Sequence, residues 1–206
     1  MPDPTTFGLF VVAALALLLV PGPAVLYVVA RSVDQGRPAG LASVLGVGIG
    51  SLVHIAFAAI GLSALLASSA AAFSVVKWLG AGYLIWLGLQ RLLARDEEEG
   101  PVTLEPERLS RIFLQGVVVN VLNPKTALFF LAFLPQFVDA DSGRVWSQAL
   151  VLGFVFVGLG LVTDSLYALA AGTVGGLIRR RRRALRYGSG GVFIGLGATA
   201  ALAKRN

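Results

Sequence analysis

Residues 112–137 read IFLQGVVVNVLNPKTALFFLAFLPQF, and Lys125 is the only charged residue between Arg111 and Asp139. An apolar stretch of this length exceeds the ~20 residues that an α-helix needs to cross the hydrocarbon core of a bilayer. Asn123-Pro124-Lys125 interrupts the stretch near its middle, and a proline there removes a backbone donor. The pattern predicts a membrane-spanning helix that is broken about halfway across.

Long stretches without charge recur along the whole chain. No charged residue lies between Asp3 and Arg31, and Asp164 is the only one between Arg144 and Arg179. Of the 206 residues, 56% are hydrophobic and 14% are charged, and the mean hydropathy of +0.81 is outside the range of a soluble domain. We therefore predict an all-α integral membrane protein with six transmembrane helices. The expected spans are 7–30, 39–66, 71–93, 112–137, 146–178 and 187–203.

The first apolar stretch could be mistaken for a secretory signal peptide. Its head contains Asp3 and no basic residue, the stretch is too long, and no convincing small-residue cleavage site follows. We interpret residues 7–30 as a retained first span.

The distribution of basic residues predicts the orientation in the membrane. Twelve Lys and Arg residues fall in loops on one side of the six spans and four on the other. Basic residues concentrate on the cytoplasmic side of membrane proteins. We expect both termini outside the cell and the acidic linker 96–99 inside.

The two halves of the chain resemble each other, which divides it into repeats at 1–94 and 112–206 joined by a charged cytoplasmic linker at 95–111. Three segments match in the same order: Gly22-Pro23 with Asn123-Pro124, 48–54 with 158–164, and 78–88 with 187–197. Because each half would have three helices, the copies must lie in opposite orientations. Two inverted three-helix repeats are typical of secondary transporters.

The helix-breaking motifs are the candidate substrate-binding site. Pro21, Gly22 and Pro23 in the first span, and Asn123, Pro124 and Lys125 in the fourth, free backbone groups at a depth where water is scarce. Lys125 and this backbone are suited to bind the carboxylate of a zwitterionic solute, and Asn120 and Asn123 would form hydrogen bonds with its other polar groups. In the alternative interpretation, Pro124 is an ordinary kink and Lys125 pairs with a structural carbonyl or extends to the interface.

Asp164 and His54 are further ionisable residues within the expected spans, at matching positions of the two repeats. A carboxylate inside a membrane is costly, and a histidine changes charge near neutral pH. Both are candidates for coupling proton entry to solute exit. For His54 the alternative is a hydrogen bond to a neighbouring carbonyl.

Composition excludes several classes of protein. The chain has no cysteine, one histidine and one methionine, so disulfides, thiolate metal sites and thiol catalysis are excluded, and we expect no metal, cofactor or enzyme active site. Five of the seventeen basic residues form the run 179–183 after an apolar span, a placement that favours anionic lipid headgroups over nucleic acid. Association into a homo-oligomer stays open.

These motifs together resemble a known family. The segments are Pro21-Gly22-Pro23, 79–84, Gln115-Gly116, Asn123-Pro124-Lys125 and 134–137. They are similar to the LysE/RhtB translocators, and the resemblance extends over nearly the whole chain. It implies export of amino acids such as lysine, threonine, homoserine or leucine across the bacterial inner membrane by proton antiport. The inverted repeats and the two breaks predict alternating access for this transport. A passive channel or a structural membrane subunit is the alternative.

Overall fold

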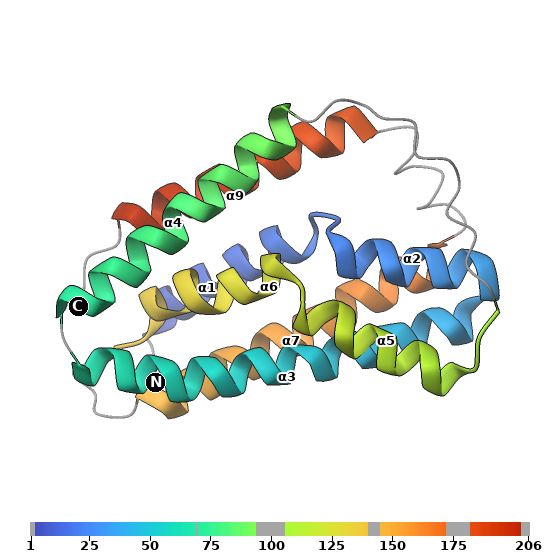
Figure 1. Ribbon diagram of the computed structural model, residues 1–206, viewed down its shortest axis with the longest axis horizontal. Helices are drawn as coiled ribbons and strands as arrows, with labels where there is room; N and C mark the ends of the chain where they lie inside the picture. The colour runs from blue at the N-terminus through green and yellow to red at the C-terminus, as the bar shows by residue number, and fades with distance from the viewer. Residues whose placement is uncertain (1–2, 69, 94–105, 140–144, 172–181, 203–206) are drawn as a thin grey trace.

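The computed structural model describes residues 3–68, 70–93, 106–139, 145–171 and 182–202. Every regular element in these ranges is a helix (Figure 1). The all-α prediction is therefore confirmed for the described part of the chain. The acidic linker at 96–99 and residues 179–181 of the basic run lie outside the described residues.

The first apolar stretch forms two helices, α1 (Pro4–Leu18) and α2 (Pro23–Gln35). Asp3 caps α1 by accepting hydrogen bonds from the amides of Thr5 and Thr6, and the hydrogen bond from the Thr6 hydroxyl lowers the pKa of this exposed carboxyl. Pro23 occupies the first turn of α2, where its missing N–H costs nothing. The axes of α1 and α2 differ by 53°, as the predicted break requires.

The fourth apolar stretch is broken in the same way. It forms α5 (Leu109–Val121), α6 (Pro124–Leu128), the π-helix η1 (Phe129–Phe133) and the 3₁₀-helix η2 (Leu134–Phe137). The Asn123 side chain caps α6 by accepting a hydrogen bond of 3.1 Å from the Lys125 amide. The bend between α5 and the segment from Pro124 to Phe137 is 46°. The sequence prediction placed this break correctly.

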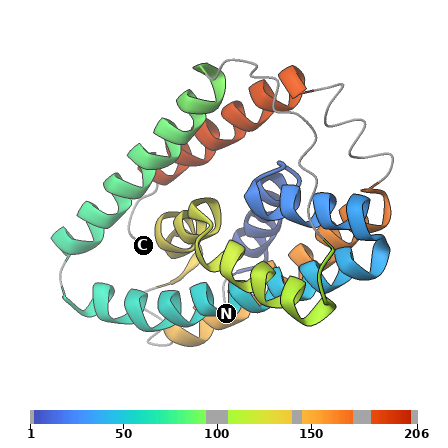
Figure 2. The same ribbon diagram turned by 45° about the vertical axis from the view of Figure 1, so that its right-hand side comes forward.

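The described residues form four further helices: α3 (Arg37–Ser68), α4 (Ala70–Leu93), α7 (Val145–Leu169) and α9 (Arg182–Leu202). Gly36 alone separates α2 from α3, and its φ of 83° is favourable only for glycine. Helix α3 packs against both α5 and α7, whereas α4 and α9 lie along each other as a pair at one side of the molecule (Figures 1 and 2). The broken helices pack against these longer ones, α2 and α5 on α3, and α1 on α7.

Two described helical stretches are long and apolar enough to cross a membrane without a partner: Arg37–Gly61 of α3, and α7. Counting each bent pair as one span raises the number to four. The structure thus supports a membrane protein, and the expected six spans stay a prediction.

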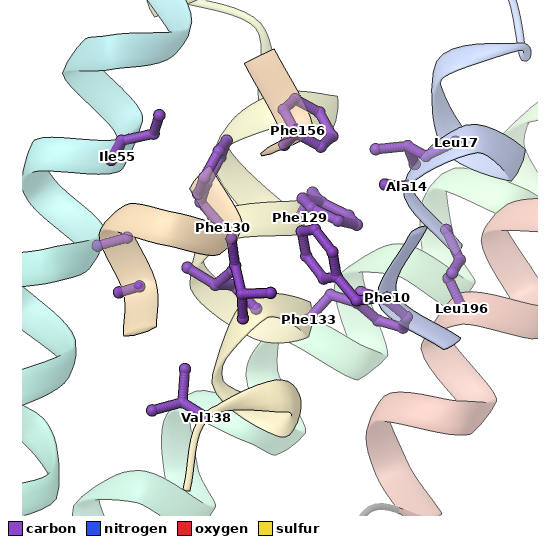
Figure 3. Packing of buried hydrophobic residues seen from close by; sticks show 14 of the residues in the cluster. Phe10, Ala14, Leu17, Ile55, Phe129, Phe130, Phe133, Val138, Phe156 and Leu196 are labelled. Atoms are coloured by element: carbon purple, nitrogen blue, oxygen red, sulfur yellow. The ribbon is translucent and has the colours of Figure 1, made fainter. Parts of the chain in front are cut away.

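A cluster of phenylalanines forms much of the apolar core (Figure 3). Phe10 of α1 lies against Phe129 and Phe137, with ring centroids 5.8 and 5.4 Å apart, and Phe129 stacks on Phe156 of α7 at 4.7 Å. We call these four residues with Phe130 and Phe133 the aromatic cluster. It fixes α1 and α7 to the second half of the broken α5–α6 unit.

Candidate functional site

A small cavity lies between the two helix breaks, on the side of the aromatic cluster where α1 ends and α2 begins. Its volume is about 30 Å³, enough for one or two water molecules and too small for an amino acid. The residues that line it come from six helices and the two breaks: Leu17, Leu18, Gly22, Ala24, Val25, Val47, Gly48, Ser51, Asn120, Asn123, Lys125, Thr126, Phe156, Val157, Gly160 and Asp164.

Lys125 links the two breaks across this cavity. Its side chain extends from the first turn of α6, is only 7% exposed, and donates a hydrogen bond of 2.6 Å from Nζ to the carbonyl of Val20. That carbonyl lies in the gap between α1 and α2. The lysine also passes Gly22, where a Cβ atom would lie 3.0 Å from Lys125 Cδ. The ammonium group is therefore held next to the N-terminus of α2.

The N-terminus of α2 adds favourable electrostatics for an anion. The amides of Ala24 and Val25 belong to the first turn, so they have no acceptor within the helix, and both residues line the cavity. The positive end of the helix dipole points to the same place. Lys125 and these amides together form the positive pole of the cavity.

Asn120 connects the surrounding helices. Its side-chain amide donates to the Val47 carbonyl and to Ser51 Oγ of α3, both at 2.8 Å. Its Oδ1 accepts from Thr126 Oγ1 at 3.0 Å and from Asn123 Nδ2 at 3.3 Å. All hydrogen-bonding groups of this buried side chain are thus engaged, and it holds the α5–α6 break against α3.

Asp164 of α7 forms the negative pole. The residue is 5% exposed and lines the cavity, and Lys125 is the charged group that acts on its carboxylate. Among the described residues, no hydrogen bond to this carboxylate is present. The neighbouring Tyr167 hydroxyl donates instead to the Leu19 carbonyl at 2.8 Å. The cavity therefore contains one buried amine, on Lys125, and one buried carboxyl group, on Asp164.

The structure separates the residues that were predicted to act together. Gly22, Asn120, Asn123, Lys125 and Asp164 all line the cavity, whereas Pro21, Pro23 and Pro124 form the breaks without lining it. The His54 ring lies outside the lining: Nε2 is 2.9 Å from the Asn120 carbonyl oxygen and the ring stacks on Phe130. This hydrogen bond to a carbonyl is the alternative considered for His54.

Sequence reasoning missed several residues of the lining. Ser51 and Thr126 supply hydroxyl groups, and Gly48 and Gly160 supply space. Thr126 directly follows the Asn-Pro-Lys motif, which could have pointed to it. Ser51 and the glycines carry no local signal, since a serine or glycine in an apolar helix is common wherever helices pack closely.

A second polar group, which we call the polar cluster, lies between α2 and α5 on the other side of the cavity from the aromatic cluster. Arg31 is 4% exposed and donates to Gln35 Oε1 and Gln115 Oε1, both at 2.9 Å. Tyr27 donates to the same Gln115 oxygen at 3.0 Å, and Gln115 donates to Glu107 at 3.1 Å. Glu107 lies 3.6 Å from Arg31 Nη2 and 3.0 Å from Arg111 Nε.

The LysE type translocator family matches residues 15–204. The chain belongs to this family. Among curated relatives of this LysE chain, an uncharacterized membrane protein of Vibrio cholerae is 34% identical over 95% of the chain and 96% of the relative. The homoserine/homoserine lactone efflux protein of Salmonella typhimurium is 30% identical over 95% of both chains, and the leucine efflux protein of Enterobacter sp. is 29% identical over 93% of both. No solved structure matches.

Proposed function

We propose that this LysE family chain exports amino acids, binding them in the cavity between the two helix breaks. The observation that carries the proposal is the pairing of one buried cation, Lys125, with one buried carboxylate, Asp164, in a lining that is otherwise neutral. A zwitterionic solute presents the complementary charges. The names of the relatives, which specify homoserine and leucine efflux, point to the same class of solute.

The carboxylate of the solute would bind at the positive pole. Lys125 Nζ donates a hydrogen bond to a backbone carbonyl of the first break. When the solute binds, its carboxylate would replace that carbonyl as the acceptor. The amides of Ala24 and Val25 are available on the same side. Asn123 and Thr126 lie beside Lys125 and suit the remaining polar atoms of the solute.

For the membrane arrangement, we propose the one that the sequence predicts. Six spans would form two inverted repeats, 1–94 and 112–206, in the inner membrane of a bacterium, with both termini outside. The similar bends of 53° and 46° in the first span of each repeat support this arrangement. The pairing of α4 with α9, the third helix of each proposed repeat, also supports it.

Transport requires that the cavity change its size and its access. Because the present cavity has room only for water, the solute would enter when helices on one side separate and would leave on the other side. Rocking about the two breaks would alternate the access. We assign proton coupling to Asp164, which lines the cavity, and a supporting role to His54.

The test is counterflow in proteoliposomes that contain the purified chain and a panel of radiolabelled amino acids. We expect exchange of at least one neutral amino acid by the wild type. Lys125→Met should reduce exchange by about 10- to 100-fold, because a hydrogen bond to a charged group contributes about 1.5–3 kcal/mol. Lys125→Arg, which keeps the charge, should retain part of the activity.

The matched control is Leu122→Ala, which changes an exposed side chain at the same break and should exchange as the wild type does. Gel filtration in detergent would check that each variant is folded. Absence of exchange for every amino acid would contradict the proposal. If exchange continues in Lys125→Met, the cavity is not the binding site. A flux that never responds to a proton gradient would favour a passive channel.

A further inference from the structure

Asp164 differs from every other buried polar residue of the cavity in its surroundings. Asn120, Asn123, Lys125 and Thr126 each make hydrogen bonds to named protein groups. The Asp164 carboxylate, 5% exposed, accepts none from the described residues. A buried carboxylate without donors is costly when it is ionised. Lys125 acts on this carboxylate through its charge but donates a hydrogen bond to the Val20 carbonyl, so a proton or a ligand cation would supply the direct partner that the ionised carboxylate lacks.

We propose that Asp164 is one shared site for the transported proton and for the α-ammonium group of the exported amino acid, so that each excludes the other. The inference rests on the proposed function and adds the identity of the group that recognises the amine. In this scheme Asp164 is neutral and protonated when the cavity is empty. When the ammonium group arrives, the carboxyl gives its proton to water and the resulting carboxylate pairs with the ammonium.

The groups around Asp164 favour this exchange. Lys125 of α6 is the one other ionisable side chain in the described lining, and its ammonium group is held at the Val20 carbonyl, beside the α2 N-terminus. Tyr167, on α7 itself, uses its hydroxyl on the Leu19 carbonyl. His54 of α3 faces Asn120 and Phe130 rather than the cavity. The described residues of α1, α2 and α5 that line the cavity have no ionisable side chain.

The charge balance of the cavity also specifies the solute. With Lys125 positive and Asp164 negative, a bound zwitterion leaves the site neutral and matches each charge with one partner. An amino-acid solute with a cationic side chain would need a second carboxylate in the site, and the described lining has only Asp164. A buried charge without a partner is strongly unfavourable. The shared site therefore selects amino acids with a free amine and an uncharged side chain.

The experiment measures protons and binding on the same sample. Purified protein in lipid nanodiscs, in weak buffer with a pH indicator dye, is mixed with L-leucine or L-homoserine. We expect release of about one proton for each amino acid bound at pH values where Asp164 is protonated. Over that range the apparent Kd should rise up to about tenfold for each unit of decreasing pH, since proton and ligand compete.

Asp164→Asn should abolish both the proton release and the pH dependence, and should weaken binding by at least about tenfold. Asp164→Glu keeps a carboxyl and should release protons as the wild type does. Asp34→Asn, which removes an exposed carboxyl elsewhere, is the matched control. On the wild type, N-acetyl-L-leucine, which lacks the ammonium group, should neither release protons nor compete with L-leucine.

Two results would overturn the inference while amino-acid exchange itself persists. One is proton release that survives in Asp164→Asn, and the other is competition by N-acetyl-L-leucine equal to that of L-leucine. If the wild type exchanges no amino acid at all, the proposed function fails first. The N-acetyl comparison uses unmodified protein, so it does not depend on the folding of a variant.

Discussion

The regions on the two sides of the cavity are held together by different chemistry. Toward α1 and η1 the neighbours are the rings of the aromatic cluster, which pack on one another without charge (Figure 3). Toward the far end of α2, the polar cluster joins α2 to α5 through a guanidinium, a carboxylate and two amide side chains. The first end depends on shape and dispersion, and the second on a set of directed hydrogen bonds.

This difference bears on how each end could open. Separating packed rings loses many weak contacts gradually, and lipid or the solute can replace them. Separating Arg31 from its acceptors exposes a charge that only water, or another anion, can satisfy. We expect the polar end to open between two discrete arrangements and the aromatic end to yield more continuously.

The largest effect should come from Phe129→Ala at the aromatic end. This ring is almost fully buried between Phe10 and Phe156, so its removal leaves a cavity that the neighbours cannot fill, at a cost of about 3 kcal/mol. Unfolding by SDS in mixed micelles would give the free energy. Leu131→Ala, at a position of the same π-helix that is 53% exposed, is the control and should cost little. Equal costs would show that the cluster contributes no specific packing.

Arg31→Leu should have the next largest effect, about 2 kcal/mol, because the acceptors on Gln35 and Gln115 lose a charged donor inside the protein. Arg31→Lys keeps the charge but not the planar pair of donors, so it should be intermediate. The same micelle measurement applies. If Arg31→Leu left the free energy of unfolding unchanged, the polar cluster would not be what holds α2 to α5.

Tyr27→Phe should cost about 1 kcal/mol, since it removes one neutral hydroxyl that donates to the Ile112 carbonyl and to Gln115. The ring remains, so packing is unchanged. The loss should shrink when Arg31 is already replaced by leucine, because both residues bind the same Gln115 oxygen. Strict additivity in this double-mutant cycle would contradict a connected cluster.

Arg111→Ala should have the smallest effect, below about 0.5 kcal/mol, although its ion pair with Glu107 is only 3.0 Å long. The arginine side chain is 73% exposed and therefore screened by solvent and salt. Its contribution should disappear when unfolding is repeated at high ionic strength. A cost similar to that of Arg31→Leu would place Arg111 within the cluster.

The sequence predicted the features that depend on local chemistry. Proline and glycine restrict or free their own backbone, so both breaks were placed correctly at Gly22-Pro23 and Asn123-Pro124. A lone charge in a long apolar stretch must turn inward, and Lys125 and Asp164 do so.

The polar cluster was not predicted, because it depends on contacts between distant segments. Arg31 was counted only as a charge that orients the chain, yet it is buried by residues of α5 more than eighty positions away. Glu107 was assigned to the charged linker. His54 matched Asp164 by position in the repeat, but the presence of Phe130 and the Asn120 carbonyl beside it could not be inferred from its own neighbours.

The connection at Gly36 has a mechanical consequence. With one residue between α2 and α3, the two helices cannot slide independently, and a swing of α2 about its proline break must carry the beginning of α3 with it. Helix α3 in turn packs against α5 and α7. A tilt of α2 at the first break should therefore also move α3, whose residues Val47 and Ser51 line the cavity.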